Sequence, residues 1–89
     1  MKQITIECAV IDSRDTFHDA LSQALSLPEW YGRNLDALHD LLAATTGETV
    51  LTFSEWLHAE EVLGRYALMA KKAMTHAASK NSNLNIEFL

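Results

Sequence analysis

The chain has 89 residues, which is enough for a single domain over residues 1–89 and too few for two. Its formal net charge of −5, from 12 acidic and 7 basic side chains, disfavours direct contact with nucleic acid and favours a basic protein partner, although many proteins are this acidic for solubility alone. The single cysteine, Cys8, excludes an intrachain disulfide, and no apolar stretch resembles a signal peptide or a membrane span, so we expect a cytoplasmic protein that does not contact a membrane.

The first half of the chain predicts one strand followed by two helices. Apolar and polar residues alternate over residues 3–8, as they do in a strand. Ser13 is the expected N-cap of the first helix, with Asp15 as the other candidate, and Pro28 ends this helix. Asn34 is the expected N-cap of the second helix. Residues at helical spacing form the apolar stripes of these helices: Phe17, Ala20, Leu21, Ala24 and Leu25 in the first, and Leu35, Leu38, Leu41 and Leu42 in the second.

The second half repeats this order and ends in a strand. A β-branched and apolar run predicts a strand over residues 49–53. Ser54 is the expected N-cap of a third helix, and Gly64 separates that helix from a fourth over residues 65–79. Alternation predicts a last strand over residues 84–88. The core candidates of the fourth helix are Leu68, Met69, Ala73 and Met74.

The order of these elements predicts the fold class. Two helices separate each pair of successive strands, and crossovers of that length return the chain parallel to the preceding strand. We therefore expect an α/β domain in which a three-stranded parallel sheet is packed with about four helices.

Two carboxylates on the second helix are the first candidates for a functional role. Asp36 and Asp40 are four residues apart, so both lie on one face of the helix, one turn from each other, where like charges repel. The dipole of the helix favours Asp36 in the first turn, but it does not favour Asp40. For an arbitrary pair of aspartates, a solvated helix face is the ordinary interpretation.

The neighbours of this acidic pair favour a protein-binding site. His39 lies beside Asp40, and the loop before the helix holds Trp30, Tyr31 and Gly32. Aromatic side chains around a small charged cluster are typical of interface hot spots. Of the two aromatic residues, we expect Tyr31 to point into the core.

Residues 27–40, with the sequence LPEWYGRNLDALHD, resemble the signature of the barstar family, which reads in outline L-P-x-(aromatic)-Y-G-x-N-L-D-A-L-x-D. The length of the chain and the order of its elements agree with this family as well. The resemblance implies a barstar-like fold and a protein that inhibits a barnase-type ribonuclease. It implies no catalytic activity and no cofactor.

The resemblance also implies roles for individual residues. Asp40 is similar to the carboxylate that occupies the phosphate site of the ribonuclease, and Asp36 matches a second acidic contact. Trp30 stands at an aromatic contact, and Gly32 and Asn34 match loop positions that meet the enzyme. The expected partner is a basic extracellular-type ribonuclease or a related nuclease toxin, bound by a monomer in a one-to-one complex.

Three positions depart from the family pattern. His39 replaces an aromatic indole, Arg33 stands where an acidic residue is familiar, and His76 aligns with another acidic contact. We include His39 and His76 among the expected partner-binding residues. Because these changes remove negative charge from the rim, they leave the target open, and an alternative is an interaction or immunity protein that uses the same acidic helix on a partner other than a ribonuclease.

Metal binding and catalysis are the remaining alternatives. No two of the four histidines have the spacing of a zinc pair on a helix, and we expect His18 and His58 at the surface. Asp36, His39 and Asp40 together have the residue types of an acid–base centre. The sequence has no glycine-rich phosphate loop and no G-x-S-x-G nucleophile motif, so an inhibitor is favoured over an enzyme.

Overall fold

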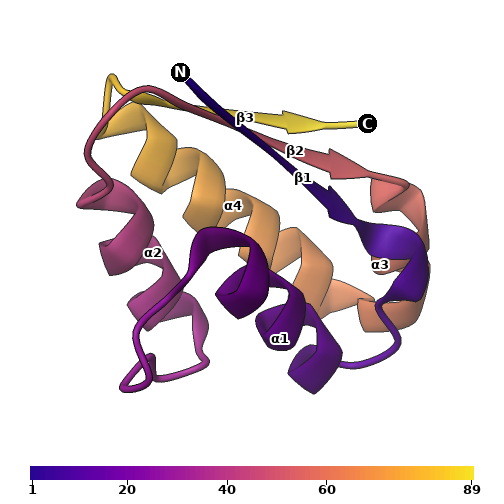
Figure 1. The fold of residues 1–89 in the computed structure, drawn as a ribbon. Coiled ribbons are helices and arrows are strands. Elements are labelled where there is room, and N and C mark those ends of the chain that lie inside the picture. The colour runs from indigo at the N-terminus through magenta and orange to yellow at the C-terminus, as the bar shows by residue number, and fades with distance from the viewer.

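A computed structural model describes all residues 1–89 (Figure 1). A short 3-10 helix (Cys8–Val10) follows the first strand. None of the helices is long and apolar enough to cross a lipid bilayer. The expected order of strands and helices is confirmed. The elements are β1 (Lys2–Glu7), α1 (Arg14–Leu25), α2 (Leu35–Ala43), β2 (Thr49–Ser54), α3 (Trp56–Leu63), α4 (Arg65–Ser79) and β3 (Leu84–Phe88).

The sheet is parallel, with the strands in the order β1-β2-β3, and all the helices lie on one side of it (Figure 1). In the strand register, Ile6, Phe53 and Phe88 are neighbours, and they share the face that the helices cover. The residues between these inward positions are mostly polar, so the opposite face of the sheet remains hydrated. The predicted fold class is therefore confirmed.

The core lies between the sheet and the helices. Phe17 and Leu21 of α1 and Leu38 and Leu42 of α2 are fully or almost fully buried, as their helical spacing predicts. Helices α2 and α4 pack against each other, and α3 lies at the far end of the helical layer from α2 (Figure 1). The position of α2 is thus fixed on one side by the core and on another by α4.

Two of the three predicted N-caps are correct. The Ser13 hydroxyl accepts a hydrogen bond from the backbone N–H of Thr16, and the Asn34 side chain accepts one from the backbone of α2. Ser54 does not cap α3: it is still part of β2, where its hydroxyl donates to the carboxylate of Glu7 on the neighbouring strand. The N-cap position belongs to Glu55, whose backbone is left-handed and whose side chain makes no capping bond.

The core face of α4 differs from the one expected. Leu68 is 52% exposed and Met69 is also exposed, whereas Met74 is buried as predicted. The buried stripe runs along Ala67, Ala70, Met74 and Ala77. These small alanine side chains let α4 come close to its neighbours, and at about 100° per residue the next two positions after Ala67 turn away from the core.

This assignment predicts a sharp difference between two substitutions in α4. Met74→Ala leaves a cavity in the core, and we expect it to lower the free energy of unfolding by about 2–5 kcal/mol. Leu68→Ala, the matched control at an exposed position, should change it by no more than about 0.5 kcal/mol. Urea unfolding of the two variants beside the unchanged protein measures both values, and equal losses would contradict the assigned core face.

Candidate protein-binding site

The N-terminus of α2 is held by hydrogen bonds within the loop that precedes it. The side-chain oxygen of Asn34 accepts from the backbone N–H of Ala37 at 2.8 Å, and its amide nitrogen donates to the carbonyl of Gly32 at 3.2 Å. A Cβ atom at Gly32 would lie only 3.0 Å from this amide nitrogen, so glycine leaves room for the cap. Gly32 and Asn34 therefore fix where α2 begins.

Both carboxylates of the candidate site are open to solvent. Asp36 and Asp40 are exposed, and the side chain of Asp40 is 85% exposed. None of the ion pairs in the protein involves Asp36. The one charged neighbour of Asp40 is His39, whose Nδ1 lies 3.4 Å from Oδ1 of Asp40. No lysine or arginine of the chain neutralises either carboxylate, so both can accept hydrogen bonds from a partner.

The two aromatic residues of the loop before α2 point in opposite directions, as expected. Trp30 is 77% exposed, the largest exposed aromatic surface of the chain, and Tyr31 is only 6% exposed. Exposure of a whole indole has a hydrophobic cost that contact with another protein would remove. Tyr31 anchors the loop that carries Trp30.

Sequence reasoning missed the residue that holds Tyr31. His18 was expected at the surface but is only 2% exposed, and its Nδ1 lies 2.6 Å from the hydroxyl of Tyr31. Its Nε2 lies 2.7 Å from the hydroxyl of Tyr66 at the start of α4. His18 therefore bridges the loop to α4. The available signal was its spacing from Leu21 and Leu25, which places it beside the apolar stripe of α1.

The bridge consists of uncharged groups. Burial lowers the pKa of His18 below its ordinary value of 6.5, and the nearby positive charge of Arg33 lowers it further. Burial also raises the pKa of Tyr31, to about 12, and raises that of Tyr66. A neutral imidazole donates through one nitrogen and accepts at the other, so His18 can satisfy one hydroxyl in each way.

Arg33 is directed toward α1. Its guanidinium pairs with the carboxylate of Asp19 at 2.9 Å and donates to the backbone carbonyl of Asp15 at 2.9 Å. The backbone of Arg33 is left-handed, with φ of 54°, a conformation that is uncommon for a residue with a side chain. The two contacts to α1 help to hold Arg33 in this conformation. The positive charge that distinguishes this loop from the family pattern is thus paired within the chain.

The structure brings two histidines together that are far apart in the sequence. Nε2 of His39 on α2 lies 2.8 Å from Nδ1 of His76 on α4, and their rings stack with centroids 5.0 Å apart. His76 thereby joins the acidic face through His39. His58, which was also expected at the surface, is half-buried, and its Nε2 lies 3.1 Å from the carbonyl oxygen of Ile11.

The expected site residues therefore fall into three groups. Asp36, Asp40 and Trp30 are exposed and free to meet a partner, whereas Gly32 and Asn34 shape the start of α2. His39 and His76 form the pair described above. Nowhere do three or more histidine, cysteine, aspartate or glutamate side chains gather as a metal ion would require.

These features define a small parallel α/β protein that displays an acidic helix beside an exposed aromatic loop. Residues 1–88 match the model of a protein family described as Barstar (barnase inhibitor). The chain is also similar to a protein of Bacillus subtilis (strain 168) named "Putative ribonuclease inhibitor YrdF", with 34% identity over 68 residues that cover 75% of each chain. The chain belongs to the barstar family, as the resemblance of residues 27–40 implied.

The His18 bridge predicts a pH dependence of stability. Because the pKa of His18 is lower in the folded than in the unfolded chain, the unfolded chain takes up its proton first as the pH falls below about 6.5. The contribution of neutral His18 to the free energy of unfolding is complete above that pH. It is lost as the pH falls toward the lower pKa of the folded chain. His18→Gln keeps a donor and an acceptor but cannot be protonated in this range.

The measurement is the free energy of urea unfolding at several pH values between 7.5 and 5. We expect it to fall more steeply with acidity in the unchanged protein than in His18→Gln. Parallel curves for the two proteins would show that His18 does not take part in this linkage.

Proposed function

We propose that this protein inhibits a basic ribonuclease by placing the exposed face of α2 and the Trp30 loop in the active-site cleft of the enzyme. The observation that carries the proposal is the state of Asp36 and Asp40, which are exposed, one helical turn apart, and unpaired with any lysine or arginine of the chain. Two such carboxylates repel each other, and a partner with clustered positive charge relieves that repulsion.

The chemistry of inhibition is phosphate mimicry. A ribonuclease binds the phosphates of RNA with arginine, lysine and histidine donors, and a carboxylate offers acceptor oxygens of similar geometry to the same donors, including paired bonds to arginine. A carboxylate contains no phosphodiester bond, so the enzyme cannot cleave it. In this proposal Asp40 occupies one phosphate position, and Asp36 binds a second cationic group.

The comparisons support this proposal at the level of the family. The matched family is described as that of a barnase inhibitor, and the B. subtilis relative carries the name of a ribonuclease inhibitor. The net charge of −5 agrees with a basic partner, whose approach it accelerates at low ionic strength.

The loop before α2 supports tight binding because it is already ordered. Tyr31 is bonded to His18, Arg33 is paired with Asp19, and Asn34 caps the helix. Ordering loops and side chains at an interface usually opposes binding, and contacts made in advance within the free protein reduce that cost.

The pair of His39 and His76 supports an inhibitor over an acid–base catalyst. Nδ1 of His39 faces Asp40 and Nε2 faces His76, so both ring nitrogens have partners within the chain and an acid–base role would require the contact with His76 to open. The pair also places hydrogen-bond donors beside Asp40. This mixed face suits a target with an acceptor next to its cations, and a nuclease toxin or another partner of that kind is the alternative to a secreted ribonuclease.

The free cysteine agrees with an inhibitor that acts in the cytoplasm. Cys8 is fully buried, and burial, together with the nearby charge of Glu7, raises its pKa to about 11. The thiol therefore stays protonated and unreactive, which suits a chain that works without a disulfide in a reducing compartment.

The first test is a pair of variants with the same change in charge. Asp40→Asn removes the carboxylate at the proposed phosphate position, and we expect a loss of about 2–5 kcal/mol in binding, since it leaves cations of the enzyme without a partner. Glu60→Gln on α3, at the opposite end of the helical layer (Figure 1), should leave binding within about twofold. Inhibition of RNA cleavage by barnase and by a panel of barnase-type ribonucleases measures both.

Two results would contradict the proposal. One is that no ribonuclease of the panel is inhibited by the unchanged protein. The other is that Asp40→Asn inhibits as well as Glu60→Gln, since the carboxylate would then have no role at the interface.

Trp30 gives a second, independent test. As an exposed aromatic side chain at the edge of the acidic face, it is expected to fill a pocket of the enzyme, so Trp30→Ala should weaken binding by about 2 kcal/mol, or roughly 30-fold. The free energy of unfolding of the Trp30→Ala variant should differ from that of the unchanged protein by less than about 0.5 kcal/mol. Trp30→Tyr, the control that keeps an aromatic ring, should retain most of the affinity, and an equal loss in both variants would argue against an aromatic contact.

A further inference from the structure

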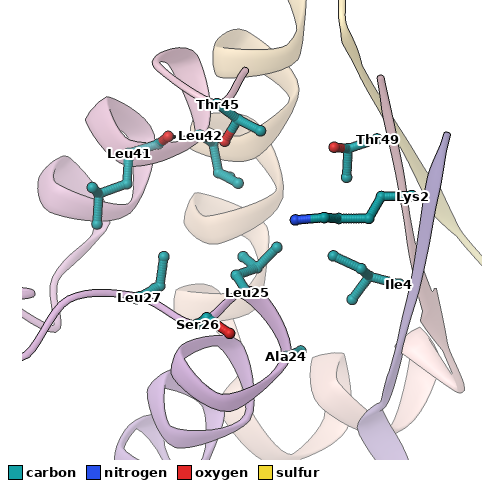
Figure 2. A pocket seen from close by; sticks show the side chains of 10 residues that line it. All are labelled: Lys2, Ile4, Ala24, Leu25, Ser26, Leu27, Leu41, Leu42, Thr45 and Thr49. Carbon is teal, nitrogen blue, oxygen red and sulfur yellow. Dashed lines mark hydrogen bonds between the residues drawn. The ribbon is translucent and has the colours of Figure 1, made fainter. Parts of the chain in front are cut away.

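A cleft under the sheet lies apart from the acidic face of α2. It has a volume of about 310 Å³ and opens between β1 and the C-terminal ends of α1 and α2 (Figure 2). Cavities that bind small molecules begin at about this size. Its lining includes Lys2 and Ile4 of β1, Leu25 and Leu27 at the end of α1, and Leu41 of α2.

One wall of the cleft is apolar and incompletely covered. Ile4, Leu25, Leu27 and Leu41 contact the core but are only half-buried. The chain turns sharply at the end of α1, where Ser26 has a left-handed backbone with φ of 52° and the backbone N–H of Leu27 returns to the carbonyl of Ser22. This turn leaves the leucines facing the cleft, so an apolar ligand would remove their remaining surface from water.

A single cation enters this cleft beside its apolar wall. Lys2 is in register with Thr49 and lies on the same side of the sheet as Ile4, which is the side that the helices cover. Figure 2 shows its side chain extending from β1 into the cleft, with the nitrogen toward α2. No carboxylate of the chain pairs with this ammonium group. Lys2 is exposed overall, and its unpaired ammonium beside the apolar wall is complementary to an anion.

Two of the three hydroxyl groups that line the cleft already donate within the chain. Thr45 donates to the carbonyl of Leu41, and Thr49 donates to the carbonyl of Gly47. The free donors of the cleft are therefore the ammonium of Lys2 and the hydroxyl of Ser26, and only the ammonium is charged. A ligand that satisfies the cleft has one anionic group and an apolar tail.

The geometry points to a binding site for a small amphipathic monoanion, a medium-chain alkyl carboxylate, with its carboxylate on Nζ of Lys2 and its chain against Ile4, Leu25, Leu27 and Leu41. This inference does not depend on the proposed function, because none of these residues belongs to the acidic face. Leu41 does follow Asp40 directly on α2, so the two sites use different sides of the same helix.

The experiment is a titration of the full chain with butanoate, hexanoate and octanoate, followed by isothermal calorimetry and by the NMR shifts of backbone amides. We expect saturable binding of octanoate, with shifts centred on the residues of the cleft. Affinity should rise by about fourfold for each added CH₂ group that is buried. Octanol, which has the same tail without the charge, should bind more weakly.

Two variants test the roles of the charge and of the space. Lys2→Met keeps the length of the side chain and removes its charge, and it should lower the affinity for octanoate by about tenfold while leaving octanol unchanged. Lys72→Met, the control for net charge, removes an exposed lysine of α4 that does not line the cleft, and it should have no effect. Ala24→Phe places a ring in the cleft and should weaken both ligands in a protein that remains folded by circular dichroism.

Several results would overturn the inference. One is that octanoate binds without saturation or produces NMR shifts spread over the whole surface, which is the behaviour of a surfactant without a site. Equal affinity for octanoate in Lys2→Met and Lys72→Met would show that the ammonium does not recognise the anion. The inhibition assay with barnase-type ribonucleases is read separately, so failure here leaves the proposed function standing and failure there leaves this inference standing.

Discussion

The buried bridge from Tyr31 through His18 to Tyr66 is the interaction on which the candidate site depends. It joins three elements: the loop before α2, helix α1 and the first turn of α4. Because Trp30 is adjacent to Tyr31, fixing the tyrosine also fixes the backbone from which the exposed indole projects. A buried hydrogen-bonded chain of this kind has few alternative arrangements, since each broken bond would leave an unpaired polar group in the core.

The distribution of cations is the second condition for an exposed acidic face. Arg33 is paired with Asp19 on α1, and Arg14 lies over the ring of Tyr66. Lys71 lies over the ring of Phe88, at the sheet. These positive charges are thus satisfied by aromatic rings or by carboxylates of α1, and none of them is held against α2. No lysine or arginine pairs with Asp36 or Asp40, so the carboxylates of α2 keep their negative potential.

Much of the fold could be predicted from the sequence, because its signals are local. Alternation places the strands, Ser13 and Asn34 begin their helices with side chains suited to capping, and the leucines of α2 repeat at helical spacing. Ser54 was misassigned because a serine before a helix satisfies the capping pattern equally well when it ends a strand and bonds across the sheet. Leu68 and Met69 were misassigned to the core because the sequence of this alanine-rich helix does not distinguish between neighbouring stripes, and the fold buries the stripe of Ala67, Ala70, Met74 and Ala77.

The candidate site was predictable only in part, because some of its contacts join residues that are far apart in the sequence. The exposed positions of Asp36 and Asp40 follow from helix geometry, but the partners of His18, His39 and His76 come from residues 13 to 48 positions away in the sequence. Histidine is found both in protein cores and at protein surfaces, and which of the two it occupies depends on the residues that the fold places beside it. The spacing of His18 from Leu21 and Leu25 was a local signal of its burial, but no local pattern identifies the partners of the three histidines.

The contrast between the two tryptophans has a practical consequence. Trp56 is buried against Phe53 and Phe88, whereas Trp30 stands in water at the edge of α2. The fluorescence of this protein therefore combines two signals of separate origin, one from an indole that senses the integrity of the interior and one from an indole that senses whatever docks on the outside. Each can be isolated by replacing the other tryptophan, so loss of structure and formation of a complex can be followed in the same cuvette without an added dye.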